Sequence, residues 1–251
     1  MALVSQGYDT MKKTFLQAVQ GGPLVFDGAI GTQLYERGLF INKCFDAANV
    51  AQPDLVAAVH EAYLEAGADV LTTYTFAANA IKLKRHGLEE QVDSINRSGV
   101  EIARRVAGEH AYVAASIGPT GLTPAMLTDR ELEEIRAAYR AQATSLCAAG
   151  ADVIVLETFR QLAEIRLALE SVKEVCELPI IAQMAFDSER KTADGATPDR
   201  VAMLLIDWGA DVVGTNCLEG PNVVFDVIED MVGRGAPVVV AATVPSARRT
   251  S

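Results

Sequence analysis

The same four residues, Gly-Ala-Asp-Val, occur three times in this chain, at 67–70, 150–153 and 209–212. Each copy follows an amphipathic stretch, and each valine opens a short apolar run. This arrangement is typical of a helix that ends at a left-handed glycine and is followed at once by a buried strand. The repetition predicts a parallel α/β sheet, in which functional side chains gather beyond the carboxyl ends of the strands.

Seven apolar runs are expected to form this sheet, and the stretches between them have helical periodicity. A capping box from Thr128 to Glu131 predicts one helix start, and Thr197-Pro198 predicts another. Nearly continuous apolar strands fit an open doubly wound sheet and a barrel equally well, so periodicity leaves that choice open. The expected strands are 24–26, 70–73, 112–115, 153–156, 180–183, 212–214 and 237–240.

The composition narrows the class of protein. A chain of 251 residues, half of them hydrophobic, fits one α/β domain with a large core. The net charge of −11 disfavours a nucleic-acid partner. No apolar run is long enough to span a membrane or to serve as a secretory signal, and four scattered cysteines do not resemble a disulfide framework. A cytoplasmic protein is therefore expected, and neither a dinucleotide-binding glycine pattern nor a P-loop is present.

Polar residues follow six successive expected strands, which predicts a cavity lined from several sides. Asp27 and Glu157 come directly after apolar runs, and two carboxylates facing one cavity can hold an ammonium group or share acid–base work. Taken singly, each has a structural alternative: Asp27 beside Gly28 can cap a turn, and Glu157 can stabilise a helix start. Cys217, taken alone, is more often a small buried packing residue.

The remaining cysteines and the histidines carry less information. Cys147 and Cys176 fall on or near helices and are expected to be packing residues. The three histidines occur in helical or helix-end contexts away from the strand ends, so we assign no catalytic role to His60, His86 or His110.

Seven short segments between about Pro23 and about Val240 form a recognisable series. They are Asp-Gly-Ala-Ile-Gly-Thr at 27–32, 53–63, Thr-Tyr-Thr-Phe-Ala-Ala-Asn at 73–79, Ile-Asn at 95–96, Ser-Ile-Gly-Pro-Thr-Gly at 116–121, Leu-Glu-Thr-Phe at 156–159 and Gly-Thr-Asn-Cys-Leu-Glu-Gly-Pro at 214–221. In this order they resemble the homocysteine S-methyltransferase family, including the homocysteine-binding module of bacterial methionine-forming enzymes, some of which are joined to a methylenetetrahydrofolate reductase. The resemblance implies an eight-stranded (β/α)8 TIM-type barrel, here without the eighth βα unit.

The resemblance also implies a reaction and a set of site residues. Methyl transfer to the homocysteine sulfur gives methionine, and Zn²⁺ lowers the pKa of that thiol. Cys217 matches the family's zinc-binding cysteine at the sixth strand end. Asp27 and Glu157 match the acids that hold the homocysteine amino group, and Gly28 to Thr32 match the segment beside its carboxylate. The methyl donor is open (a folate through cobalamin, betaine, S-methylmethionine or S-adenosylmethionine), as is a reductase or folate/cobalamin partner module.

One departure from the family bears on activity. The family takes two further zinc ligands from an adjacent cysteine pair at the eighth strand, and this sequence contains no such pair. Cys44, in the long loop after the first strand, would raise the count only to two of the three ligands of a catalytic zinc site. We therefore expect a helical lead at 1–22, an incomplete barrel at 23–240 with unpaired edges, and a polar tail at 241–251 outside the family.

Three hypotheses follow. The first is a homocysteine S-methyltransferase domain whose zinc site is incomplete in this chain. The second is a truncated, non-catalytic remnant that at most binds homocysteine. The third and weakest is an unrelated barrel lyase or aldolase using Asp27 and Glu157, for which a lysine or phosphate site at the strand ends is missing. An early stop or a change of reading frame near Ala241 would explain why the tail at 241–251 does not resemble the family.

Overall fold

A sheet of six parallel strands forms the centre of the computed structural model, which describes residues 13–39, 44–217, 220–233 and 240–243. The strands are hydrogen-bonded to one another in chain order, and this order never reverses. A doubly wound sheet reverses its order at a switch point, whereas a barrel keeps chain order, so the described strands have the barrel arrangement. The strands are β1 (Val70–Thr72), β2 (Tyr112–Ile117), β3 (Val153–Phe159), β4 (Ile180–Met184), β5 (Val212–Asn216) and β6 (Val240–Thr243).

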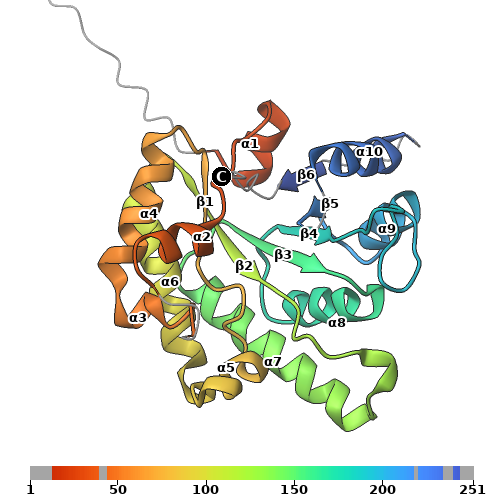
Figure 1. Cartoon of the computed structure of the whole chain (residues 1–251), viewed down its shortest axis with the longest axis horizontal. Helices are drawn as coiled ribbons and strands as arrows, with labels where there is room; N and C mark the ends of the chain where they lie inside the picture. Colours follow the sequence, from red (N-terminus) through yellow and green to blue (C-terminus); the bar gives the residue numbers. More distant parts are fainter. Residues whose placement is uncertain (1–12, 40–43, 218–219, 234–239, 244–251) are drawn as a thin grey trace, which may run out of the picture.

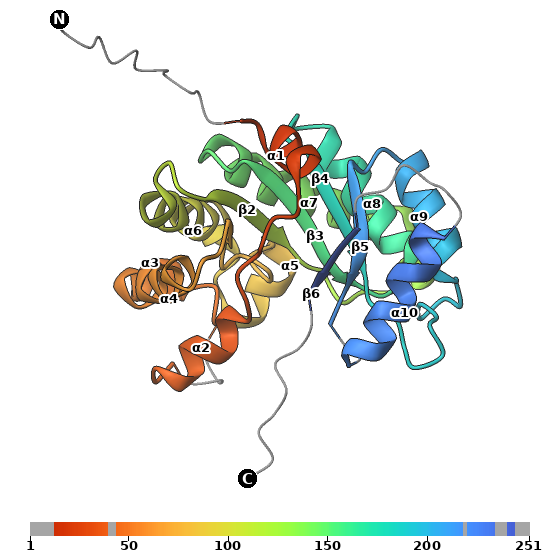
Figure 2. The ribbon, with the colours of Figure 1, turned by 90° about the horizontal axis from the view of Figure 1, so that it is seen from above.

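Helices cover the outside of this sheet (Figures 1 and 2). In Figure 2, α3, α4 and α6 lie on one side of the strands and α8, α9 and α10 on the other. The expected parallel α/β architecture is confirmed. The helices are α1 (Phe15–Gly21), α2 (Ile30–Glu36), α3 (Ala48–Ala51), α4 (Pro53–Glu65), α5 (Ala80–Leu83), α6 (Val92–Ala107), α7 (Asp129–Ala148), α8 (Leu162–Lys173), α9 (Pro198–Asp207) and α10 (Pro221–Val232), with short 3₁₀ turns at Lys84–His86, Glu89–Gln91 and Pro124–Met126.

The repeated Gly-Ala-Asp-Val motif joins a helix to a strand in all three copies. Gly67, Gly150 and Gly209 have φ angles of 96°, 92° and 94°, which residues with a Cβ rarely adopt. They lie two residues beyond the ends of α4, α7 and α9, and the valine of each motif opens β1, β3 or β5. The predicted helix stops are confirmed, as are the Thr128 capping box and the helix start at Thr197-Pro198.

The aspartate of each motif sets the alignment of neighbouring strand segments. The Oδ2 atoms of Asp69, Asp152 and Asp211 accept hydrogen bonds of 2.8, 2.7 and 2.9 Å from backbone N–H groups of the preceding strand segment. The backbone N–H of each aspartate donates back to that same segment. This reciprocal pair fixes the register at the amino ends of the strands.

The first expected strand differs from the structure, and most of the seventh lies outside the described residues. The run at 24–26 makes only an isolated parallel bridge, between Phe26 and Val70, because few of its backbone groups pair with β1. Of the expected strand at 237–240, residues 237–239 lie outside the described residues; Val240 belongs to β6, which pairs with β5 through Thr243.

Helix α1 packs across the amino ends of the strands. A capping box at Thr14 starts it, and Phe15 is 3 % exposed. The Phe15 ring meets Tyr112 edge to face at 5.7 Å, and the Tyr112 hydroxyl donates to the backbone oxygen of Lys13 at 2.8 Å. Phe15 belongs to the same buried cluster as Val153 and Val212, so α1 forms the floor of the interior of the sheet.

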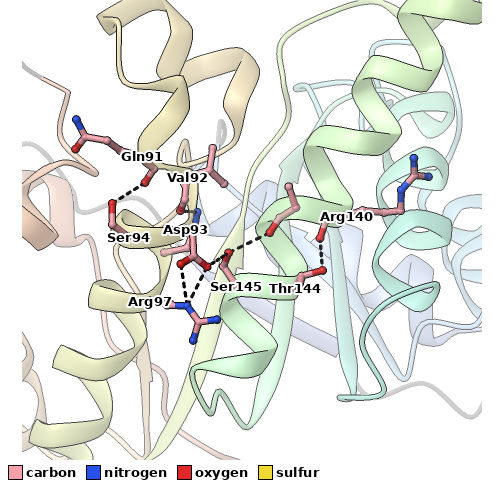
Figure 3. A network of polar contacts seen from close by, with 10 residues as sticks. Gln91, Val92, Asp93, Ser94, Arg97, Arg140, Thr144 and Ser145 are labelled. Carbon is pink, nitrogen blue, oxygen red and sulfur yellow. Dashed lines mark hydrogen bonds and ion pairs between the residues drawn. The ribbon is translucent and has the colours of Figure 1, made fainter.

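Polar contacts join two of the outer helices, α6 and α7 (Figure 3). Ser145 on α7 donates to Asp93 on α6 at 2.8 Å, while Arg97 Nε contacts both oxygens of the same carboxylate at 2.9 and 3.0 Å. These bonds lower the pKa of Asp93. They fix how α7 lies against α6. None of the helices that the structure describes is long and apolar enough to cross a membrane.

Candidate functional site

A cavity of about 1120 Å³ lies inside the sheet, above the floor made by α1. The segment 22–32 forms one wall, α1 contributes Phe15 and Val19, and side chains from β1 to β5 and the loop after β1 form the rest. Five of the predicted site residues line it: Asp27, Gly28, Thr32, Glu157 and Cys217. The prediction that the strand ends share one cavity is therefore supported by where these side chains lie.

Asp27 is 7 % exposed and is held by β1. Its Oδ2 accepts a 2.8 Å hydrogen bond from the Thr72 N–H, and its own N–H donates to Val70 at 3.0 Å. Burial raises the pKa of this carboxyl from its ordinary 3.8 to about 7; the Thr72 bond opposes the rise and the charge of Glu157 adds to it. Its side chain bonds a neighbouring strand, so Asp27 does more than cap its own turn.

Glu157 lies within β3 and faces the cavity, so the alternative that it begins a helix is wrong. One oxygen accepts from the hydroxyl of Ser116, and the other accepts from Asn216 Nδ2 at 3.1 Å. Burial raises the pKa of Glu157, and the Ser116 bond opposes this shift. Both neighbours are neutral. Among the described residues, therefore, no cation pairs with this carboxyl.

Asn216, the residue before Cys217, connects Glu157 to Thr158. Its Oδ1 accepts from the Thr158 N–H at 2.8 Å, and its Nδ2 donates to Thr158 Oγ1 at 2.8 Å as well as to Glu157. Thr158 and Cys217 both have φ angles of 63°, an unusual conformation for residues with a Cβ. Such strain persists where the surroundings enforce it and is common at functional sites. Asn216 and Ser116 belong to the motifs that carry the family resemblance, but neither was assigned a site role, because the sequence does not show which side chains hydrogen-bond across strands.

His60 lies beside Asp27, so the expectation that it is away from the strand ends is wrong. Its Nδ1 is 4.0 Å from Asp27 Oδ2, and the ring is fully buried. Burial lowers the pKa of His60 to about 4, so the ring is neutral at physiological pH. The signal was present in the sequence: His60 occupies the same helix face as Val56, Val59 and Tyr63, which packs towards the core.

Two glycines let aromatic side chains lie close to the cavity wall. A Cβ on Gly28 would stand 2.8 Å from the Tyr63 hydroxyl, and one on Gly118 would overlap the Phe76 ring. Both approaches are closer than real Cβ contacts, so glycine is required for the present positions of these rings. Gly118 thereby keeps Phe76 against the cavity.

The described residues do not fit a catalytic zinc site. Cys217 is exposed and lines the cavity, but Cys44 lines a separate cavity of about 240 Å³ together with His86. Cys147 and Cys176 pack in the helical layer. Within the described ranges, no three cysteine, histidine or acidic side chains converge on one point, whereas catalytic zinc takes three protein ligands. Cys217 is one thiol without the partners such a site needs.

Solved structures with the same architecture include a homocysteine methyltransferase. The metallated form of MmuM from Escherichia coli superimposes with a TM-score of 0.77 at 26 % identity, covering 90 % of this chain and 86 % of that one. YagE, a member of the dihydrodipicolinic acid synthase family, matches with a TM-score of 0.53 at 15 % identity, which shows a shared fold alone.

Proteins with similar sequences include methionine synthases and betaine–homocysteine S-methyltransferases. Methionine synthase of Mycobacterium tuberculosis is 29 % identical over 231 residues, which are 85 % of this chain but 19 % of that protein. The chain thus spans about a fifth of the methionine synthases it matches. Betaine–homocysteine S-methyltransferase 1 of Sus scrofa is 29 % identical over 226 residues, covering 88 % of this chain and 80 % of that one. The family model for homocysteine S-methyltransferase matches residues 24–249, and the chain therefore belongs to this family of methyltransferases.

Proposed function

We propose that the cavity binds L-homocysteine and that this domain presents the homocysteine thiol for methyl transfer, giving methionine. The observation that carries the proposal is the pair of carboxyl groups, Asp27 and Glu157, that face one cavity with no cationic partner among the described residues. Buried carboxylates are stable only when they are paired or hydrogen-bonded. An ammonium group between them supplies the missing charge.

The electrostatics of the two acids suit an ammonium ligand. Burial raises the pKa of both groups, and ionised Glu157 also raises that of Asp27, so the empty cavity does not favour two full negative charges. A bound ammonium ion reverses this balance, because an opposite charge favours the ionised form. Ser116 and Asn216 then hold Glu157 while its oxygens face the ligand.

The thiol end of homocysteine would lie towards Cys217, at the exposed mouth of the cavity. In the family, zinc supplies the activation of that thiol. Cys217 is the residue here that would contribute one sulfur ligand. The described residues do not fit the complete metal site, so we assign them the binding and orientation of homocysteine and derive no metal-dependent step.

The cavity also favours one class among the open methyl donors. Its charged lining consists of Asp27 and Glu157, and no lysine, arginine or histidine lines it among the described residues. Such a cavity offers no cation to hold a polyanion, and the aromatic side chains of Phe76 and Tyr74, which also line it, suit contact with an onium group. We therefore propose a sulfonium or quaternary ammonium donor, such as S-methylmethionine or betaine, in preference to a folate.

Calorimetry with a matched ligand pair tests the proposal. L-homocysteine is titrated into the full chain alongside 4-mercaptobutyrate, which keeps the thiol and the carboxylate but lacks the ammonium group. Homocysteine should bind at least about tenfold more tightly, since charged hydrogen bonds contribute about 1.5–3 kcal/mol. Equal affinities for the two thiols would contradict the proposal.

Activity distinguishes the methyltransferase from a remnant that only binds homocysteine. The full chain is dialysed, its bound zinc is measured, and methionine formation is followed with each donor. Tight zinc near one per chain together with methionine formation supports catalysis by this chain. Homocysteine binding without metal or methionine formation supports the remnant.

A further inference from the structure

The His60 imidazole is fully buried, and neither ring nitrogen has a hydrogen-bond partner among the described residues. An unsatisfied polar group in the core lowers stability, and an apolar residue would fit the same helix face without that cost. His60 therefore calls for an explanation outside packing. Its proximity to Asp27 suggests a part in homocysteine binding, a role that rests on the proposed function.

The position of His60 links it to one oxygen of Asp27. Its Nδ1 faces Oδ2 at 4.0 Å, and Oδ2 already accepts the Thr72 N–H. A shift of about 1 Å brings Nδ1 to hydrogen-bond distance. Two donors on Oδ2 leave Oδ1 as the acceptor for a ligand.

The surroundings of Asp27 make a neutral donor useful. Glu157 on β3 and the Tyr63 hydroxyl on α4 are the titratable groups that act on Asp27 besides His60, and neither is a cation. Because His60 is itself uncharged, it can stabilise the carboxylate without competing with an incoming ammonium group for the negative charge.

We propose that His60 is a positioning residue whose Nδ1–H donates to Asp27 Oδ2 when the carboxylate holds the homocysteine ammonium group. The neutral ring carries its proton on Nδ1, and no proton is transferred. The hydrogen bond orients the carboxylate and favours its ionised form, and the same contact gives the buried ring the partner that it otherwise lacks.

A pair of variants separates the hydrogen bond from packing. His60→Asn keeps an N–H donor near the Nδ1 position, whereas His60→Leu removes the donor and keeps an apolar side chain. His110→Asn is the matched control, because His110 is exposed on the turn before β2. Circular dichroism first establishes that each variant has the helix content of the unchanged chain.

Homocysteine affinity is then measured by calorimetry from pH 5.5 to 8.5. We expect His60→Leu to weaken binding by about tenfold to a hundredfold at neutral pH and to move the rise in affinity about one pH unit upward. His60→Asn should recover most of the loss, and His110→Asn should match the unchanged chain. Affinity for 4-mercaptobutyrate should not respond to either His60 variant, because that ligand has no ammonium group.

The unchanged chain provides a second measurement that needs no variant. The ¹⁵N signal of the His60 Nδ1 should move to the position of a hydrogen-bonded N–H on addition of homocysteine. Binding of homocysteine with no change in this signal, or with equal affinity and pH profile in His60→Leu, overturns the inference and leaves the proposed function intact. Failure of the unchanged chain to bind homocysteine overturns both.

Discussion

The two ends of the sheet use the same chemical group for different purposes. At the amino ends, Asp69, Asp152 and Asp211 each accept a backbone N–H from the neighbouring segment and thereby fix strand register. At the carboxyl ends, Asp27 and Glu157 face a cavity and have no cationic partner among the described residues. The comparison shows that the surroundings of a carboxylate decide its role: the same group fixes strand register at one end of the sheet and faces a cavity at the other.

Solvent access accounts for much of the difference. The amino-end aspartates are half-buried or exposed, so water completes the solvation of their charge. Asp27 also accepts a backbone N–H, yet it is buried, and burial raises its pKa to about 7. A buried acid with an incomplete set of partners favours a charged ligand.

The largest effect that tests this contrast is expected from Glu157→Gln. The change keeps the shape of the side chain but removes a charge proposed to pair with ammonium, so homocysteine binding should weaken by about 2–5 kcal/mol in calorimetry. Glu164→Gln is the matched control. Glu164 is also buried, but its Oε1 accepts hydrogen bonds from Thr120 and Tyr139 and it does not line the cavity. Its substitution should lower thermal stability while leaving homocysteine affinity nearly unchanged.

The second effect is a pH dependence carried by Asp27. The pKa of Asp27 is about 7 in the folded chain and 3.8 in the unfolded chain. As pH rises, the Asp27 carboxyl therefore ionises at a lower pH in the unfolded chain than in the folded one. The contribution of Asp27 to stability is fully present below pH 3.8 and is lost as pH rises to about 7, by on the order of 4 kcal/mol. Denaturant unfolding of the unchanged chain and of Asp27→Asn should therefore diverge across this window. Parallel pH profiles for the two proteins would mean that the pKa of Asp27 is not shifted by burial.

A smaller effect is expected at the amino ends. Asp152→Ala leaves the Val113 N–H without its acceptor and removes the 2.7 Å ion pair with Arg104, which should lower the free energy of unfolding by about 1–2 kcal/mol. Homocysteine affinity should be unchanged, because this residue is at the opposite end of the strand. Asp207→Ala, at an exposed helix position, is the control. Weaker homocysteine binding in Asp152→Ala would contradict the inference that the amino-end aspartates affect stability alone.

The smallest effect concerns the glycine that ends α7. Gly150 has a φ angle of 92°, and no heavy atom lies within 4 Å of the place that an added methyl group would take, so Gly150→Ala adds backbone strain without a clash. The free energy of unfolding should fall by about 1 kcal/mol, as measured by denaturant titration. An unchanged midpoint would indicate that the turn can relax without this conformation.

Parts of the site could be predicted from sequence because they follow from chain periodicity. Asp27 and Glu157 were found as polar residues directly after apolar strands, Cys217 was found through the family resemblance, and all three line one cavity. The prediction that His60 lies away from the strand ends was wrong. Helical periodicity places His60 on a buried face but does not show which segment packs against that face. Asn216 and Ser116 act through hydrogen bonds between strands, which no local pattern encodes.

The sequence by itself determined the alternation of strands and helices, the glycine stops and the family. The first two depend on local conformational preference and on the period of apolar residues, and the family depends on the order of short motifs; all of these are written in neighbouring positions. Only the tertiary structure decided that Cys44 and Cys217 line different cavities and that His60 lies against Asp27. Such contacts join residues far apart in the chain, and their distances are set by how the helices pack on the sheet.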